Sequence, residues 1–246
     1  LGAQHPAAII VEPKGDQAET FVMKWRADLN DAGFCVFQTN APAGGWKGNV
    51  GIRLIQEFDA LVAKGNVGKE WATAGKVNPN RILIVSPREG GPAAISIIEK
   101  HHKRISGALM VSVSPWVHDS ESIKMWRPSK DAWSVPIWAT MPVNIKAGAP
   151  ILLLWRQIAA AKPKEASLTI DPRIQLDDNE PDKSVTNWIS AIASGKKPSP
   201  GPDRQALRET KRYEDAAKQL MTAMQIVKPA DAGANFSKAE GPMDFD

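Results

Sequence analysis

The feature that most constrains the fold is a regular alternation between short apolar runs and longer segments with apolar residues at helical spacing. The run 7–11 is continuously apolar and is followed by Pro13 and Gly15, as expected of a strand buried on both faces. Segment 19–31 then has apolar residues at helical spacing and is closed by Gly33. This alternation predicts an α/β fold, with a mostly parallel sheet and helices on both of its faces.

The same patterns predict about six strands and the helices between them. Strands are expected at 7–11, 34–38, 81–85, 107–113, 135–140 and 167–170. Helices are expected at 19–31, 52–62, 92–103, 151–161 and 184–193. An insertion rich in Trp and Ser, 114–134, separates the fourth strand from the fifth.

The character of the chain changes after Gly195. A Pro-rich linker is followed by a charged helix with a thin apolar stripe and by an end rich in Pro, Gly and Ala, at 196–202, 203–227 and 228–246 respectively. We therefore expect one α/β domain at 1–195 and a helical and extended tail at 196–246.

Composition excludes several classes of function. The net charge is +4, but Lys and Arg alternate with Asp and Glu without a dense basic run, so no nucleic-acid partner is expected. No apolar run approaches the ~20 residues of a transmembrane helix. The single cysteine, Cys35, lies in an apolar run and is expected in the core. With four histidines and one cysteine no metal-ligand spacing arises, so neither a metal nor another cofactor is expected.

The N-terminus bears on localisation. The chain begins at Leu1 rather than at Met, which agrees with a processed terminus. This observation leaves two interpretations open: a periplasmic or secreted protein after removal of a signal peptide, or a cytoplasmic protein.

One stretch resembles a known family. Residues 79–94, Pro-Asn-Arg-Ile-Leu-Ile-Val-Ser-Pro-Arg-Glu-Gly-Gly-Pro-Ala-Ala, resemble the strand, nucleophile elbow and helix of the α/β-hydrolase superfamily, where the strand runs into G-x-S-x-G. The resemblance covers about residues 7–195. Segments 25–34 and 187–189 are also similar to uncharacterised bacterial α/β-hydrolase-like proteins. The resemblance implies an esterase-like hydrolase fold.

The residues that carry the family's chemistry are missing from this stretch. In register with the motif, Ser86 stands at the first glycine, Arg88 at the nucleophile and Glu89 just after it. An arginine side chain stays protonated and offers only hydrogen-bond donors, so it cannot attack an acyl carbon.

The other parts of the triad are also absent. No carboxylate follows the expected strand 135–140 within residues 141–144, and no histidine occurs after His118. Glu12 stands in the oxyanion region, where a carboxylate opposes a developing negative charge. Catalysis by serine needs an imidazole to accept its proton. The sequence therefore favours a non-catalytic protein, a pseudo-hydrolase that serves as a binding or structural subunit of a larger assembly.

Two interpretations of the altered site remain open. Glu12, Arg88 and Glu89 are candidate ligand-binding residues in a crevice that would take an anionic ligand. Alternatively, Arg88 pairs with Glu12 and fills the former pocket. The alternative function is a hydrolase with a relocated active site, for which the candidates are Ser86, Ser112 and His118.

Aromatic residues suggest where a protein partner or a second copy would bind. The candidate contacts are Trp116, Trp126 and Trp133 of the insertion, with Phe236 and Phe245 of the tail. Exposed Trp is a frequent interface anchor. Core packing against the sheet is the equally favoured alternative for the insertion tryptophans and for Trp138, and sugar binding is a third.

Overall fold

The computed structural model describes the parts of the chain that form the α/β core. The described residues are 4–11, 18–39, 50–63, 76–87, 90–111, 131–140, 168–171, 183–198 and 215. For 18–24, 50–52, 92 and 168–171 the description is of the backbone alone. The expected helix 151–161, most of the insertion and almost all of the tail therefore lie outside the described residues, and the division into 1–195 and 196–246 stays a prediction.

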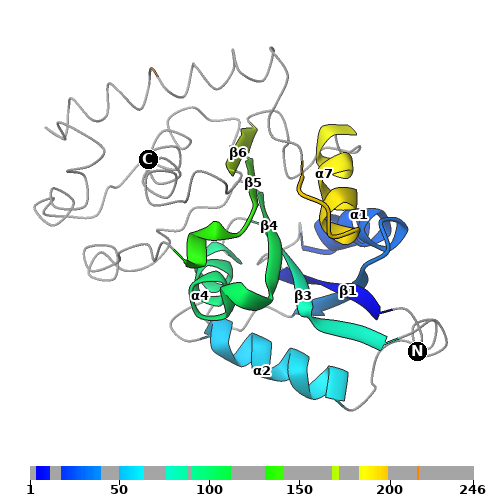
Figure 1. The fold of residues 1–246 in the computed structure, drawn as a ribbon, viewed down its shortest axis with the longest axis vertical. Coiled ribbons are helices and arrows are strands. Elements are labelled where there is room, and N and C mark those ends of the chain that lie inside the picture. The colour runs from blue at the N-terminus through cyan, green and yellow to red at the C-terminus, as the bar shows by residue number, and fades with distance from the viewer. Residues whose placement is uncertain are drawn as a thin grey trace, which may run out of the picture.

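The centre of the fold is a six-stranded sheet in the order β2-β1-β3-β4-β5-β6, in which every neighbouring pair is parallel. The strands are β1 (Gln4–Val11), β2 (Cys35–Thr39), β3 (Lys76–Pro87), β4 (Ile105–Val111), β5 (Ile137–Thr140) and β6 (Leu168–Asp171). The predicted mostly parallel sheet is confirmed (Figure 1).

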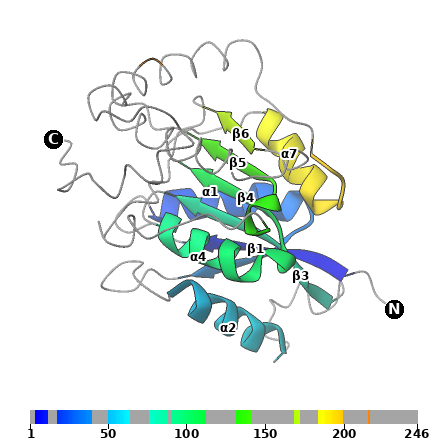
Figure 2. The ribbon, with the colours of Figure 1, turned by 60° about the vertical axis from the view of Figure 1, so that its left-hand side comes forward.

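Helices cover both faces of this sheet. Helices α1 (Ala18–Asp31) and α7 (Lys183–Ala193) lie on one face, and α2 (Val50–Ala63) and α4 (Gly91–His101) lie on the other (Figures 1 and 2). Two short 3-10 turns, η2 (His102–Arg104) and η3 (Ala132–Ser134), precede β4 and β5.

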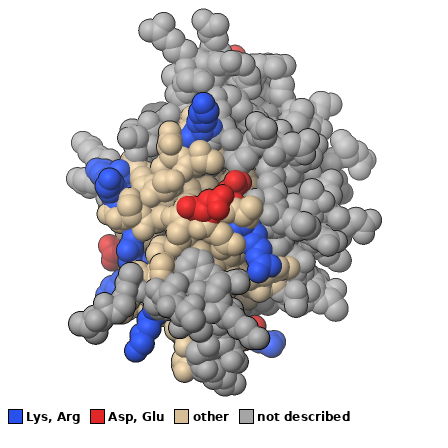
Figure 3. Space-filling view, turned by 90° about the vertical axis from the view of Figure 1, so that its right-hand side faces the viewer, with Lys and Arg blue, Asp and Glu red and all other residues tan. Residues whose placement is uncertain are grey.

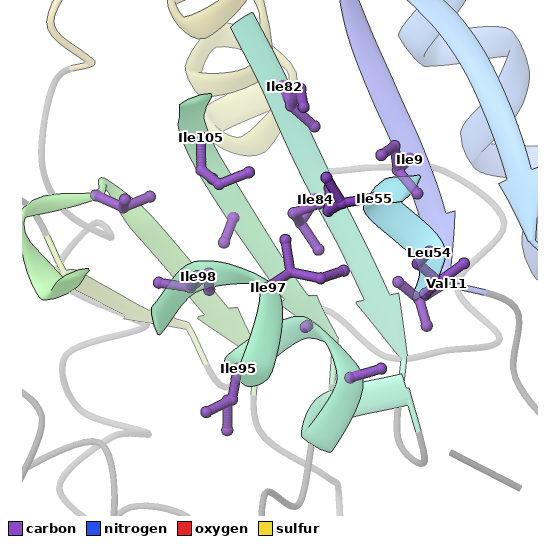
Figure 4. Close-up of a cluster of buried hydrophobic side chains, with 14 of the residues drawn as sticks. Ile9, Val11, Leu54, Ile55, Ile82, Ile84, Ile95, Ile97, Ile98 and Ile105 are labelled. Carbon is purple, nitrogen blue, oxygen red and sulfur yellow. The ribbon is translucent and has the colours of Figure 1, made fainter. Parts of the chain in front are cut away.

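Alternation along the strands divides the core into two layers, because successive side chains of a strand point to opposite faces. In β1, Ala7, Ile9 and Val11 pack in the layer with α2 and α4, while Ala8 and Ile10 pack in the layer with α1 and α7. In Figure 4, Leu54 of α2 lies beside Val11, and Ile97 of α4 points toward β3. The end of β1 is therefore apolar on both faces, which explains its continuous apolar run.

The ends of α1 and α7 follow one pattern. Gly33 (φ 94°) and Gly195 (φ 72°) adopt the left-handed conformation just past each helix, which glycine tolerates best. Both ends carry the paired hydrogen bonds of a Schellman motif, Gly33 N–H to Asn30 and Phe34 N–H to Leu29 in α1. The predicted closure of the first helix by Gly33 is confirmed.

A side chain from the sheet strengthens the end of α7. The Nη2 atom of Arg81 in β3 donates to the carbonyl oxygen of Ala193 at 2.7 Å and to that of Ile192 at 3.4 Å. The guanidinium satisfies the Ala193 carbonyl, one of the last acceptors that a helix leaves open, and makes a longer contact to the Ile192 carbonyl, which also accepts from the Gly195 N–H. The contact ties β3 to the end of α7, although Arg81 and Ala193 are more than a hundred positions apart in the sequence.

Several predicted boundaries differ from those of the structure. The segment 78–80, expected as a connection, belongs to β3, which begins at Lys76. It fits because the register between β1 and β3 shifts after Pro6, where Pro6 pairs with Asn78 and Ala7 pairs with Ile82. The expected helix 92–103 ends as α4 at His101 and tightens into η2, after which β4 starts at Ile105 rather than at 107.

Candidate functional site

The candidate site lies where the strand order reverses. β1 has β2 on one side and β3 on the other, so the connections leave the sheet in opposite directions at the β1/β3 boundary. Parallel sheets bind ligands beyond the carboxyl ends of their strands at such a point. Ile10 pairs with Val85, which brings Val11 and Ser86 to this edge side by side.

The ends of β1 and β3 approach the start of α4 very closely at this point. A Cβ atom built on Gly90 would lie 2.6 Å from Ser86 Oγ and 2.9 Å from Val11 Cγ1. Gly90 has ordinary helical backbone angles (φ −70°, ψ −15°), so the lack of a side chain matters for space alone. Only glycine fits between the ends of β1 and β3 without displacing a neighbour.

This contact has the register of a nucleophile elbow. β3 ends at Pro87 and α4 begins at Gly91, with Gly90 as its N-cap. The strand–turn–helix context expected of the motif is therefore present, with Ser86 and Gly90 touching at its first and last glycine positions. Arg88 stands between them in the sequence.

The side chains at the middle of the motif are not placed. Arg88, Glu89 and Glu12 lie outside the described residues, so the anionic crevice and the Arg88–Glu12 pair both stay predictions. Of the three residues considered for a relocated active site, Ser112 and His118 also lie outside the described residues. Ser86 is the one whose surroundings are known.

Ser86 is completely buried, and its hydroxyl has no hydrogen-bond partner among the residues that the structure describes. A nucleophile must reach the substrate and must pass its proton to a base. The Oγ atom instead faces the N-cap of α4. In this arrangement Ser86 fills the crossing between strand and helix, without the exposure of a nucleophile and without a base among the described residues.

The N-terminus of α4 adds a favourable field for negative charge. The N-cap makes no side-chain hydrogen bond, and a proline stands in the first turn. The first N–H groups of a helix are unsatisfied within it and carry the positive end of its dipole. The site thus combines a helix N-terminus with the carboxyl ends of two strands.

Trp133 corrects one prediction about the partner surface. The ring of Trp133 in η3 is completely buried in the core layer under α4, so it does not offer a contact to a partner. Trp138 in β5 is also buried and packs edge-to-face against Trp188 of α7, with ring centroids 6.1 Å apart. Core packing is the alternative that holds for these two. Trp116, Trp126, Phe236 and Phe245 lie outside the described residues.

A polar cluster next to α4 has no counterpart in the predictions from the sequence. Arg104 of η2 binds Asp59 of α2 with two hydrogen bonds, at 2.5 and 3.0 Å, and its Nε donates to the Pro79 carbonyl at 2.9 Å. His101 lies beside this pair, where burial and the Arg104 charge lower its pKa below the usual 6.5. These residues come from three distant segments, so only the packing of α2 against α4 brings them together.

The described part of the chain shows neither a single dense patch of charge on the face in Figure 3 nor a cluster of metal-binding side chains. Figure 3 shows Lys and Arg scattered around the face that carries α1 and α7, with acidic residues near its middle. Among the described residues no group of three His, Cys, Asp or Glu side chains is placed to hold a metal ion. No helix in the described part is long and apolar enough to span a membrane. Cys35 is buried at the start of β2, as expected.

Comparison with known proteins supports the fold. No family model and no curated protein matches the chain. A variant of the AtxE2 isopeptidase with Astexin3-dC4 bound matches with a TM-score of 0.50 at 15% identity, over 89% of this chain and 40% of that one. SOBER1 from Arabidopsis thaliana has a TM-score of 0.46 at 13% identity, over 78% of this chain and 99% of that one. YeeB from Lactococcus lactis, described as a sugar hydrolase, has a TM-score of 0.47 at 14% identity, over 85% of this chain and 91% of that one.

The strand order, the helices on both faces and the crossing at Ser86 and Gly90 define an α/β-hydrolase-like fold. The solved structures that resemble the chain include hydrolases by their printed descriptions. At these identities the similarity is one of fold, and the activity must be argued from the site.

Proposed function

We propose that this chain is a non-catalytic α/β-hydrolase-like protein that acts as a binding or structural subunit of a larger assembly. The observation that carries the proposal is the contact between Ser86 and Gly90, which supports the register that puts Arg88 at the nucleophile position. A guanidinium stays protonated at physiological pH and has no lone pair for attack. The residue at the nucleophile position would then donate hydrogen bonds to a bound group and would not attack a substrate.

Arg88 is proposed to hold a carboxylate or another oxyanion at the carboxyl ends of β1 and β3. The uncapped N-terminus of α4 supports this, because its field favours a negative group at the same place. The carboxylate comes either from Glu12, which follows β1 in the sequence, or from a ligand. In both cases Arg88 acts as a binding group.

The second candidate function is hydrolysis from a relocated site built on Ser86, Ser112 and His118. The observation that favours it is the similarity in fold to the AtxE2 isopeptidase. The burial of Ser86 and its unpaired hydroxyl count against Ser86 as the nucleophile. Ser112 with His118 is the version of this function that those two facts leave intact.

One experiment separates the two functions. The full chain is treated with a fluorophosphonate probe and with a panel of short-chain nitrophenyl esters, beside an active serine esterase as positive control. We expect no labelling and no ester hydrolysis above a heat-denatured sample. Labelling that disappears in Ser86→Ala or Ser112→Ala would overturn the non-catalytic proposal.

A second experiment tests the binding role of Arg88. The melting temperatures of the wild-type protein and of Arg88→Gln are measured in increasing acetate and in increasing phosphate. Stabilisation by either anion in the wild type alone supports a ligand site, because binding to the folded state raises stability. Loss of stability in Arg88→Gln without any anion effect supports the pair with Glu12. Arg53→Gln, on the exposed face of α2, is the control for the loss of one charge.

A further inference from the structure

Helices α2 and α4 lie side by side and connect the candidate site to the opposite edge of the sheet (Figures 1 and 2). At the site, Gly90 is the N-cap of α4, and a Cβ atom there would lie 2.9 Å from Val11 Cγ1. Leu54 of α2 lies beside the same valine (Figure 4). Both helices therefore begin near the end of β1, so a contact that holds their far ends together also helps to fix how they lie at the site.

The far ends of the two helices are joined by Arg104. This residue belongs to η2, directly after α4, and donates hydrogen bonds to both carboxylate oxygens of Asp59 on α2, at 2.5 and 3.0 Å. Its Nε atom also donates to the Pro79 carbonyl of β3 at 2.9 Å. A guanidinium matches a carboxylate in this paired geometry, so both oxygens of Asp59 are used. We call these three residues the α2/η2 clamp.

His101, the last residue of α4, has a buried nitrogen close to the clamp. Its Nε2 atom is buried and has no hydrogen-bond partner among the residues that the structure describes. In a neutral imidazole this leaves one hydrogen bond unmade. Protonation turns Nε2 into a charged donor, and a buried charge without an acceptor costs much more than one unmade hydrogen bond. The closed clamp therefore accommodates neutral His101 and disfavours its protonated form.

The charged groups that act on His101 come mainly from the clamp. Burial has the largest effect on its pKa and lowers it, and the charge of Arg104 lowers it further. Asp59 raises this pKa in part, and Lys100 of the same helix lowers it least. The turn η3, which also packs here, contains no charged residue, and Arg81 of β3 binds α7 on the opposite face of the sheet. A protonated His101 is therefore repelled by the cation of the clamp and attracted by its anion.

We propose that the α2/η2 clamp is a pH-sensitive switch, in which proton uptake by His101 separates Arg104 from Asp59 and loosens α2 and α4 beside the candidate site. The proton goes to the ring nitrogen that carries no hydrogen, and Asp59 then accepts a hydrogen bond from the imidazolium in place of Arg104. Because the closed clamp lowers the affinity of His101 for the proton, the proton in turn lowers the stability of the closed clamp. The clamp is therefore closed at pH 6.5, the usual pKa of histidine, and it opens as the pH falls below that value.

An effect on ligand binding rests on the proposed binding role of the site, whereas the switch itself does not. In the closed form, the close approach of Gly90 and Leu54 to Val11 holds the start of α4 and the end of β1 in one arrangement. In the open form only a fraction of the molecules has that arrangement, so the same ligand is bound more weakly. Regulation of the site by pH would follow from this difference.

The coupling between Arg104 and Asp59 at two pH values tests the switch. Urea unfolding of the full chain, of Arg104→Met, of Asp59→Asn and of the double variant gives this coupling as a double-mutant cycle. The cycle is measured at about pH 8 and at about pH 5, both above the ordinary pKa of an aspartate. We expect the coupling to be present at the higher pH and largely lost at the lower one. Equal coupling at both pH values overturns the proposal.

His101→Gln assigns the effect to one ring. In this background the coupling should remain at the lower pH, because no proton is taken up at position 101. His102→Gln is the matched control, since it removes the next imidazole in the chain and should leave the loss of coupling as in the wild type. Loss of the coupling in the His101→Gln background would assign the pH dependence to another group and would equally rule out the switch.

Hydrogen exchange of the wild-type chain follows the two helices without a variant. After correction for the intrinsic pH dependence of amide exchange, protection at 57–61 in α2 and at 94–98 in α4 should fall at the lower pH. Protection in α1, on the opposite face of the sheet, should not fall. A uniform loss in all helices, or no loss in α2 and α4, would contradict the switch. None of these measurements uses a ligand, so they decide the switch whether or not the site binds an anion.

Discussion

The hydroxyl of Ser86 lies against Gly90, so close that a Cβ atom at position 90 would be 2.6 Å from it. This contact joins the end of β3 to the start of α4 and sets the register of the elbow. It also explains why small residues stand at positions 86 and 90, as the resemblance to a nucleophile elbow implies. Small residues at positions 86 and 90 are needed for the crossing, whereas position 88 lies between them in the sequence and is not constrained by it.

Gly90→Ala should destabilise the protein by about 1–3 kcal/mol, because the new methyl group overlaps Ser86 Oγ and Val11 Cγ1 in a packed core. The free energy of unfolding in urea measures this. Adding Ser86→Ala should restore part of the loss, since it removes the closest of the two contacts. Equal losses in the single and double variants would show that the Ser86 contact is not the cause.

Ser86→Ala alone should be neutral or should stabilise the protein by up to about 1 kcal/mol. The hydroxyl is buried without a partner, so its removal takes away an uncompensated polar group. The measurement is again urea unfolding. Ser106→Ala is a matched control, because the Ser106 hydroxyl donates to the Ile82 carbonyl at 3.1 Å and its loss should cost about 1 kcal/mol.

Arg81→Met should destabilise the protein by about 1–2 kcal/mol. The variant keeps an apolar stem but removes the donor that satisfies the Ala193 carbonyl at the end of α7 and that also contacts the Ile192 carbonyl. Thermal unfolding measures the loss. Arg53→Met is the control on α2, where the ion pair with Glu57 is exposed and should contribute less than about 0.5 kcal/mol. A similar loss in both variants would contradict the role of Arg81 as a cap.

Arg104→Lys should destabilise the protein although it keeps the charge. The guanidinium makes two hydrogen bonds to Asp59 and a third to the Pro79 carbonyl, and an ammonium group cannot match this fork. We expect a loss of about 1 kcal/mol or more in urea unfolding. Lys103→Arg, at the neighbouring exposed position, should have no effect. Wild-type stability in Arg104→Lys would show that a positive charge is enough to hold Asp59 and that the three hydrogen bonds of the guanidinium are not needed.

Stability should fall as the pH drops below about 6.5 through the titration of His101. Burial, followed by the Arg104 charge and more weakly by Lys100, lowers the pKa of His101 in the folded state, and Asp59 opposes this in part. The unfolded chain, with a His pKa near 6.5, therefore binds the proton more readily than the folded chain. The full stability is present above that pH and is lost below it.

His101→Gln should flatten this pH dependence, measured as the melting temperature between about pH 5 and pH 8. The variant carries no ionisable ring, so the difference in proton binding at this position disappears. His102→Gln on the next residue controls for the loss of an imidazole in the same turn. An unchanged pH profile in His101→Gln would contradict the prediction.

Much of the fold follows from local patterns in the sequence. The apolar run at 7–11 and the helical spacing at 19–31 closed by Gly33 correspond to β1 and α1 in the structure. These features depend on neighbours a few residues away, so the sequence is sufficient to predict them. Cys35 was expected in the core for the same reason, and it is buried.

The candidate site was predicted only in part. The motif at 79–94 located the turn between β3 and α4, whereas its placement of Arg88 at the nucleophile position remains a prediction. The same motif also suggested Ser86 as a relocated nucleophile. The burial of Ser86 depends on the approach of β1, which is distant in the sequence, so no local pattern reveals it.

The sequence by itself determined the parallel α/β architecture, because the alternation of apolar runs and helical spacing depends on residue types and their order. It also predicts that the usual Ser-His-Asp order is missing, and that remains a prediction. Tertiary structure decided which side chains are accessible and which distant groups meet. It buried Trp133, joined Arg81 to the end of α7 and brought Arg104 to Asp59. Burial and long-range hydrogen bonds depend on how the layers pack around the sheet, and that packing is a property of the whole core rather than of any one segment.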